Sequence, residues 1–185
     1  MYIILFGIYR KFTQYYTFPK YLSKLILFCT FILSDINIYE ATVPDRMHHL
    51  DLGLFHYQIE YTRDLLKKQY DRSLVDELDR RLAAIPRFPG LKIFANGLQS
   101  ISRSTANEYR NLMKVMIFVV DNLYDTNINN IENFTNNKDL VKLYESWNEM
   151  YAISRYEVFK ESDLEKFEVC IILIVTLLYK ISPAY

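Results

Sequence analysis

The chain has 185 residues, enough for one domain with a sizeable apolar core. Only 4 glycines and 5 prolines argue against a turn-rich β architecture and predict long helices. The formal net charge is zero, so the overall charge gives no reason to expect nucleic-acid binding. The two cysteines, Cys29 and Cys170, lie far apart in apolar runs, which predicts buried free thiols in a reducing compartment.

The first 39 residues form an apolar segment that contains the nine-residue run LILFCTFIL at 25–33. A basic start followed by an apolar run is typical of a signal peptide, but no small-x-small cleavage site follows. The run is also shorter than the about 20 residues that a membrane-spanning helix needs. Three interpretations remain open: a buried helix or strand, translated non-coding sequence, and a targeting or membrane segment. The basic residues of the segment are Arg10, Lys11, Lys20 and Lys24.

Residues 44–70 predict one long helix, with Pro44 at its first position and Asp45 in its first turn. At about 100° per residue, one narrow strip of this helix is polar and two stripes are apolar. We expect such a helix to be wedged between neighbours and to show only its polar strip to solvent. The strip comprises Asp45, His49, His56 and Arg63, with His48 on its edge. The apolar stripes comprise Met47, Leu50, Leu54, Tyr57, Tyr61 and Leu65, and Leu52, Phe55, Ile59 and Leu66.

A second helix is predicted over 74–85, with Ser73 as its cap and Asp76 at the capping-box position. Its apolar face comprises Leu74, Leu78, Leu82 and Ile85. Pro86 and the Pro89-Gly90 pair end it. Residues 87–102 follow as an irregular stretch that holds two of the four glycines.

Three further helices are predicted from capping residues and apolar periodicity. Thr105 and Glu108 form a capping box that opens a helix over 105–124. The asparagine-rich stretch 125–137 is a predicted loop, and Asn137 caps a helix over 138–159. Its core face comprises Leu140, Val141, Tyr144, Trp147, Met150, Tyr151 and Ser154.

The last predicted helix opens with the capping box Ser162-x-x-Glu165 and becomes wholly apolar at 169–179. Eleven residues are too few to span a bilayer. The run is either a packed C-terminal helix, an exposed apolar tail for a membrane or a partner, or foreign sequence. The chain as a whole predicts an all-α fold, an irregular bundle of about five to six helices.

The histidines and the basic residues are the candidate binding groups. Asp45, His48, His49 and His56 share one helix side and could hold a metal, but Arg63 in the same strip repels a cation. Partly exposed histidines without a metal are the interpretation we prefer. A second candidate is a nucleic-acid contact, because basic residues cluster around Phe88 and Phe94. These residues are Arg80, Arg81, Arg87, Lys92 and Arg103. Because Asp76, Glu77 and Asp79 lie beside them, the same residues are equally consistent with a solvated face that binds nothing.

Three stretches resemble one family. PDRMHHLDLGLF at 44–55, ELDRRLAAIPRFPGLKIFANGLQ at 77–99 and TANEYRNLMKVMIFVV at 105–120 occur in that order. Together they resemble the Plavaka-type DDE transposases, CACTA-like enzymes of fungi, over roughly residues 39–166. The resemblance assigns Asp45 and His48 to the Asp-x-x-His signature of that family. It implies the helical insertion of an RNase H-like core, with these two residues bracing that core or approaching the DNA end.

The chain offers no identifiable counterpart of the catalytic carboxylates of that family. Two-metal strand transfer needs three carboxylates around paired ions, Mg²⁺ or Mn²⁺ in an intact family member. Upstream of Asp45 only Asp35 and Glu40 are available, the family's Cys-x-x-Cys is missing, and the downstream acids carry no distinguishing pattern. Those downstream acids are Glu157, Glu161, Glu165 and Glu168.

We therefore expect no catalytic residue, no metal and no activity of the chain alone. The expected division is an apolar segment (1–39), a helical transposase-like domain (40–167) and an apolar tail (168–185). The expected function is a degenerate or truncated transposase-derived protein, at most a helical module that binds DNA or a partner such as an intact transposase. The resemblance implies the nucleus or cytoplasm. The alternative is a small membrane-associated protein anchored by 25–33 and 169–179.

Overall fold

A computed structural model describes residues 47–181, apart from 71, 100, 102–103 and 125–135. All regular elements among these residues are helices, which confirms the predicted all-α class. They are the π-helix η1 (Met47–Phe55) and the α-helices α4 (His56–Tyr70), α5 (Arg72–Ala83), α6 (Ala106–Val120), α7 (Asn137–Ile153) and α8 (Glu161–Ile181). Asp45, Cys29, Arg103 and the run 25–33 lie outside the described residues.

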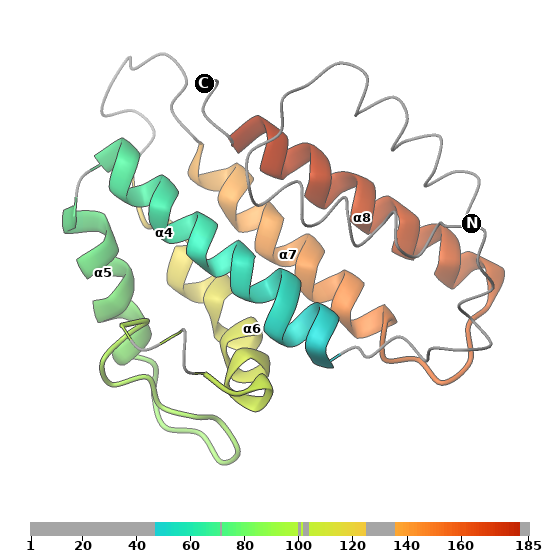
Figure 1. Ribbon diagram of the computed structural model, residues 1–185, viewed down its shortest axis with the longest axis horizontal. Helices are drawn as coiled ribbons and strands as arrows, with labels where there is room; N and C mark the ends of the chain where they lie inside the picture. Colours follow the sequence, from blue (N-terminus) through green and yellow to red (C-terminus); the bar gives the residue numbers. More distant parts are fainter. Residues whose placement is uncertain (1–46, 71, 100, 102–103, 125–135, 182–185) are drawn as a thin grey trace.

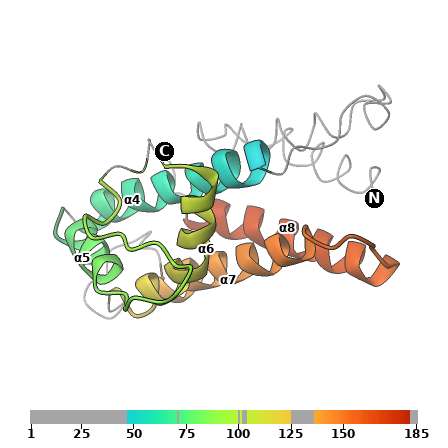
Figure 2. The same cartoon turned by 90° about the horizontal axis from the view of Figure 1, so that it is seen from below.

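Helices α7 and α8 form an antiparallel pair, and α4 runs alongside them in a second layer (Figures 1 and 2). Helix α6 packs against η1 and α7, and α5 packs against α4 and α6. The aromatic centre of the core lies where η1 meets α4. There the fully buried Phe55 ring lies 5.5 Å from Trp147, 6.3 Å from Tyr144 and 6.4 Å from Tyr109, measured between ring centroids. Aromatic burial of this kind joins η1, α6 and α7 in one core.

The single helix predicted from Pro44 to Tyr70 is wrong in its first part, because residues 47–55 form a π-helix. A π-helix bonds residue i to i+5, so its side chains do not follow the 100° spacing that the α-helix continues. Met47, expected on an apolar stripe, is 40% exposed, whereas Leu50 and Phe55 are buried as the stripes predicted. Two members of the predicted polar strip, His56 and Arg63, are not turned to solvent alone, because they contact α6 and the segment before it. Polar side chains are instead buried on the core side, at Asp51, Gln58 and Thr62.

The capping residues give mixed outcomes. The predicted box at Thr105 is confirmed: its backbone N–H donates to Glu108 Oε2 (2.6 Å), and its hydroxyl accepts from the Glu108 N–H (3.4 Å). Two other caps are wrong. Ser73 lies inside α5, which begins at Arg72, and the box at Ser162 is replaced by Asp163, whose carboxylate accepts from the Lys160 N–H at 3.0 Å.

Other helix ends are shifted by one to six residues. Asn136, rather than Asn137, caps α7, and α7 ends at Ile153 rather than at Phe159. Helix α5 ends at Ala83, and α6 ends at Val120 rather than at Tyr124. The shifts of one or two residues lie within the usual ambiguity of helix ends, whereas the predicted C-terminal ends of α6 and α7 are wrong by about one turn or more.

The apolar run 169–179 lies within helix α8, and part of it packs in the core. Cys170, Ile174, Leu177 and Ile181 are buried, so one side of the run packs in the core, and Cys170 is a buried free thiol as predicted. The helix is continuous across the predicted boundary between residues 167 and 168. Within the part of the chain that the structure describes, no helix has both the length and the apolar character needed to cross a membrane.

Candidate nucleic-acid interface

The connection between α5 and α6 projects from the helices and carries the predicted contact residues (Figure 1). At its tip, the Leu91 N–H donates to the Phe88 carbonyl (3.0 Å), with Pro89 and Gly90 between them. Gly90 has φ 79°, so Pro89-Gly90 forms a type II turn, in which a residue with positive φ must follow the proline. Phe88 is 71% exposed beside the exposed Arg87. The tip therefore presents an aromatic ring and a cation to solvent.

The base of the connection is fixed by side chains of α4 and α5. Asp79 Oδ1 accepts from the Leu98 N–H at 2.8 Å, while Arg63 Nη1 donates to the Leu98 carbonyl at 3.3 Å. The same two side chains approach each other, with Arg63 Nη2 3.9 Å from Asp79 Oδ2. Gly97 has φ 60°, and a Cβ there would lie 2.4 Å from the Asp79 Cβ. Only glycine allows this close approach of the connection to α5.

Lys92 links the connection to the first turn of α6. Its amine is ion-paired with Glu108 and lies 5.7 Å from the centroid of the Phe94 ring. The hydrogen bond from Lys92, followed by the backbone N–H of Thr105, lowers the pKa of the Glu108 carboxyl. Lys92 is thus neutralised within the fold, and its contribution to an anion-attracting surface is reduced.

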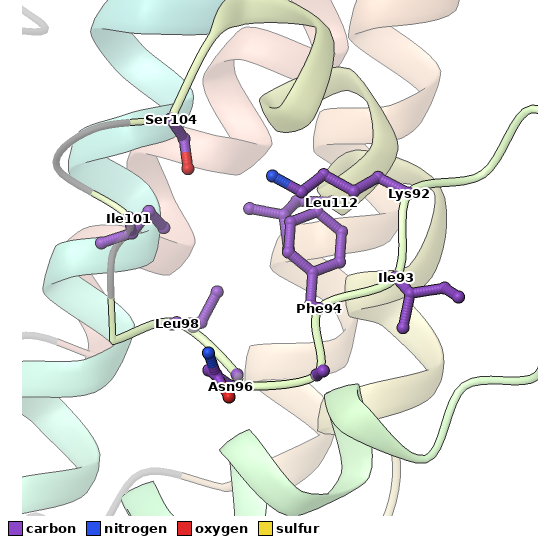
Figure 3. Close-up of a pocket in the computed structure, with 10 residues that line it drawn as sticks. Lys92, Ile93, Phe94, Asn96, Leu98, Ile101, Ser104 and Leu112 are labelled. Carbon is purple, nitrogen blue, oxygen red and sulfur yellow. The ribbon is translucent and has the colours of Figure 1, made fainter.

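A pocket of about 180 Å³ lies between the connection and α6 (Figure 3). Apolar side chains of Phe94, Leu98, Ile101 and Leu112 form much of its wall, and polar atoms of Lys92, Asn96 and Ser104 lie at its edge. The polar groups are few and the volume is small, so the pocket fits a single ring or a short side chain rather than an extended ligand.

The predicted basic residues have separate roles in the structure. Arg81 donates to the carbonyls of Asp121 (2.7 Å) and Asn122 (2.9 Å), which satisfies the C-terminal end of α6. Arg80 is 69% exposed and makes two 2.7 Å hydrogen bonds to Glu77. Hydrogen bonds from Arg80 and then Arg81 lower the Glu77 pKa from 4.5 to about 2. Arg80, Arg87 and Lys92 are therefore the predicted contact residues that remain exposed among those described, with Arg80 paired to Glu77 and Lys92 to Glu108.

The histidines fall in two different environments. His48 is exposed in η1, whereas His56 Nδ1 lies 2.5 Å from the Tyr109 hydroxyl and Nε2 lies 3.3 Å from Glu60 Oε1. Tyr109 donates its proton to the Ile101 carbonyl at 2.8 Å, so His56 Nδ1 must be the donor to Tyr109. Burial first, then the charges of Glu60 and Glu108, raises the Tyr109 pKa to about 12.

This network attaches the end of the connection to α4 and α6. Sequence reasoning did not identify Tyr109 or Glu60 as its members. The i, i+4 spacing of His56 and Glu60 was a usable signal, but the contact with Tyr109 depends on tertiary packing. Within the described ranges, no three His, Cys, Asp or Glu side chains come together as ligands for a metal ion.

Comparisons with protein-family models, with curated protein sequences and with solved structures find no match to this chain.

Proposed function

We propose that the chain is a transposase-derived helical module that binds DNA through the connection between α5 and α6 and does not cleave DNA by itself. The transposase origin rests on the sequence resemblance of three stretches. Two of these stretches, 77–99 and 105–120, lie against each other, through Lys92 with Glu108 and through Arg81 with the end of α6. They thus behave as one structural unit.

The observation that carries the DNA proposal is the exposed tip, with Phe88 next to Arg87 on a turn whose base is fixed. An aromatic face stacks on a base and a guanidinium binds a phosphate, so the pair suits a nucleic-acid strand. The fixed base lowers the ordering cost of binding, because the tip needs little rearrangement. Arg80, on the last turn of α5, adds a second exposed cation, although Glu77 offsets part of its charge.

The test is a salt titration of binding to single- and double-stranded DNA, followed by fluorescence anisotropy. Arg87→Ala should reduce the slope of log affinity against log salt by about 1, because one phosphate contact is lost. Phe88→Ala should weaken single-strand binding by about 5- to 150-fold and leave the slope unchanged, since stacking is worth about 1–3 kcal/mol.

Arg155 and Tyr156 provide a matched control, because they form another exposed pair of an arginine followed by an aromatic residue. Arg155→Ala and Tyr156→Ala should leave DNA binding as it is. Equal losses from both pairs would indicate nonspecific attraction, and a salt slope of zero would contradict DNA binding through phosphate contacts.

The absence of cleavage is tested separately. Purified chain incubated with supercoiled DNA and Mg²⁺ or Mn²⁺ should leave the DNA intact. Metal-dependent cleavage that Asp45→Ala abolishes would contradict this part of the proposal, since it would place a working carboxylate set in the chain.

A further inference from the structure

The pocket between the α5–α6 connection and α6 has no part in the DNA contact proposed for the exposed tip. Its volume is about 180 Å³. An apolar protein cavity of about 150 Å³, lined by leucine, isoleucine and phenylalanine, holds one benzene ring. The pocket therefore has room for one six-membered ring with its substituents, rather than for the two fused rings of a purine.

The wall of the pocket suits a flat, uncharged ring. Phe94, Leu98 and Leu112 line it and are 9%, 1% and 0% exposed, so this part of the wall belongs to the core. Lys92, the cation at the edge, is already ion-paired with Glu108. A phosphate would be repelled by that carboxylate, whereas a neutral ring would not. The pocket thus favours a neutral aromatic ring over an anion.

Polar groups lie at the edge of the pocket, where the edge of a base would lie. Figure 3 shows the Lys92 amine extended over the Phe94 ring toward Ser104, whose hydroxyl points into the pocket. Asn96 lies at the opposite end, beside Leu98. A hydroxyl and an amide each donate and accept hydrogen bonds, and an amine donates them. A pyrimidine base offers carbonyl acceptors or an amine donor along its edge, which a hydrocarbon ring lacks.

The tip and the pocket are close enough to bind the same DNA strand. Phe88 and Lys92 are four residues apart, which limits their separation to about 13–14 Å. Successive nucleotides of a stacked strand are about 3.4 Å apart, so about four of them cover this distance. Lys92 and Asn96 are exposed, so the pocket opens to solvent beside them. A base can therefore enter while its sugar and phosphate stay outside.

We propose that the pocket binds one unpaired pyrimidine base of a single DNA strand, with its ring against Phe94 and its edge at Ser104 and Asn96. Proteins that hold an unstacked base enclose it with aromatic and apolar side chains and hydrogen-bond its edge. The proposal rests on DNA binding by the α5–α6 connection and adds a base preference to it. The tip binds any strand, because every base has a face for stacking, and the pocket selects pyrimidines.

The first test uses the full-length chain and free nucleosides, so its result does not depend on DNA binding by the tip. Thymidine at millimolar concentrations should cause saturable NMR shifts of the amides of Phe94, Leu98 and Ile101. Adenosine should bind at least about 10-fold more weakly, because a pocket of this size rejects the larger base. Ser104→Phe places a ring in the pocket and should abolish the response to thymidine.

The second test measures the anisotropy of labelled oligo-dT and oligo-dA of equal length. Ser104→Phe should weaken oligo-dT binding by about 5- to 150-fold, the range expected for loss of one stacked base. It should leave oligo-dA binding and the salt slope unchanged, since no phosphate contact is lost. Asn96→Ala should weaken oligo-dT binding by about 2- to 12-fold, as expected for one hydrogen bond. Ser162→Phe, at the exposed start of α8, is the control and should change neither.

The two tests distinguish the pocket from the tip. DNA binding in which oligo-dT affinity is the same for Ser104→Phe, Asn96→Ala and the original protein would overturn the pocket proposal alone. Thymidine binding without DNA binding would support the base site and contradict the DNA interface. Equal or tighter binding of N-acetylphenylalaninamide would overturn the base site in favour of a protein side chain. Circular dichroism checks that each variant folds.

Discussion

The α5–α6 connection and the α7–α8 pair are held in place by different forces. The α7–α8 pair is fixed by apolar burial, with Leu140, Leu143 and Ile174 at most 2% exposed. The connection is fixed by a few directional contacts, from Asp79 and Arg63 to Leu98. Apolar burial tolerates small shifts and sums over many atoms, whereas each polar contact depends on one geometry. We therefore predict that removing one buried side chain from the α7–α8 pair destabilises the whole fold. Removing one polar contact of the connection should instead release only the connection.

The largest effect is expected in the α7–α8 region. Trp147→Ala removes a 1% exposed ring that packs on Phe55, and should lower the free energy of unfolding by about 3–5 kcal/mol in urea denaturation. Trp147→Phe is the control: it keeps an aromatic ring and deletes an indole N–H that has no acceptor among the described residues, so the loss should be smaller. Equal losses would mean that the ring contact with Phe55, which phenylalanine keeps, does not account for the stabilisation.

A smaller loss is expected at the base of the connection. Gly97→Ala combines φ 60° with a Cβ that meets Asp79, and should cost about 2–3 kcal/mol. Gly90→Ala is matched for positive φ, but nothing lies within 4 Å of its Cβ, so it should cost about 1 kcal/mol. If thermal unfolding showed equal losses, the close contact with α5 would be irrelevant to stability.

Asp79→Ala should act mainly on the connection. It leaves the Leu98 N–H without its carboxylate acceptor and should cost about 1–2 kcal/mol. Hydrogen exchange at Leu98 should accelerate at least tenfold, while exchange at Leu143 in α7 should follow only the global loss. Equal acceleration at Leu98 and Leu143 would contradict the separation of the two regions.

The smallest effect should depend on pH. Because Arg80 and Arg81 lower the Glu77 pKa from 4.5 to about 2, its stabilisation is fully present above pH 4.5 and is lost as pH falls toward 2. Solvent screens the pair, so Glu77→Gln should cost at most about 1 kcal/mol near pH 7. The difference from the original protein should shrink when unfolding is measured between pH 4.5 and 2. A constant difference across this range would exclude the ion pairs as its cause.

Local sequence signals predicted the elements of the fold better than their ends. The Thr105–Glu108 box and the apolar spacing of α6 involve residues within one or two helical turns, and both were predicted correctly. The Ser73 and Ser162 caps were wrong, because Asp163 competes at the start of α8 and α5 starts before Ser73. The candidate interface was predicted only as a list of basic residues. Whether a cation stays exposed depends on distant groups, such as the α6 carbonyls that bind Arg81.

The sequence alone determined the helical class and the end of α5 shortly before Pro86, because these depend on backbone chemistry and spacing within a few residues. Tertiary structure alone decided that His56 hydrogen-bonds to the Tyr109 hydroxyl and that residues 47–55 form a π-helix. It also decided that Arg63 and Asp79 hydrogen-bond to the backbone of Leu98. These features join positions up to 53 residues apart or depend on packing around Phe55. A helical period read along the chain cannot specify them, since it fixes which residues share a face but not what that face meets.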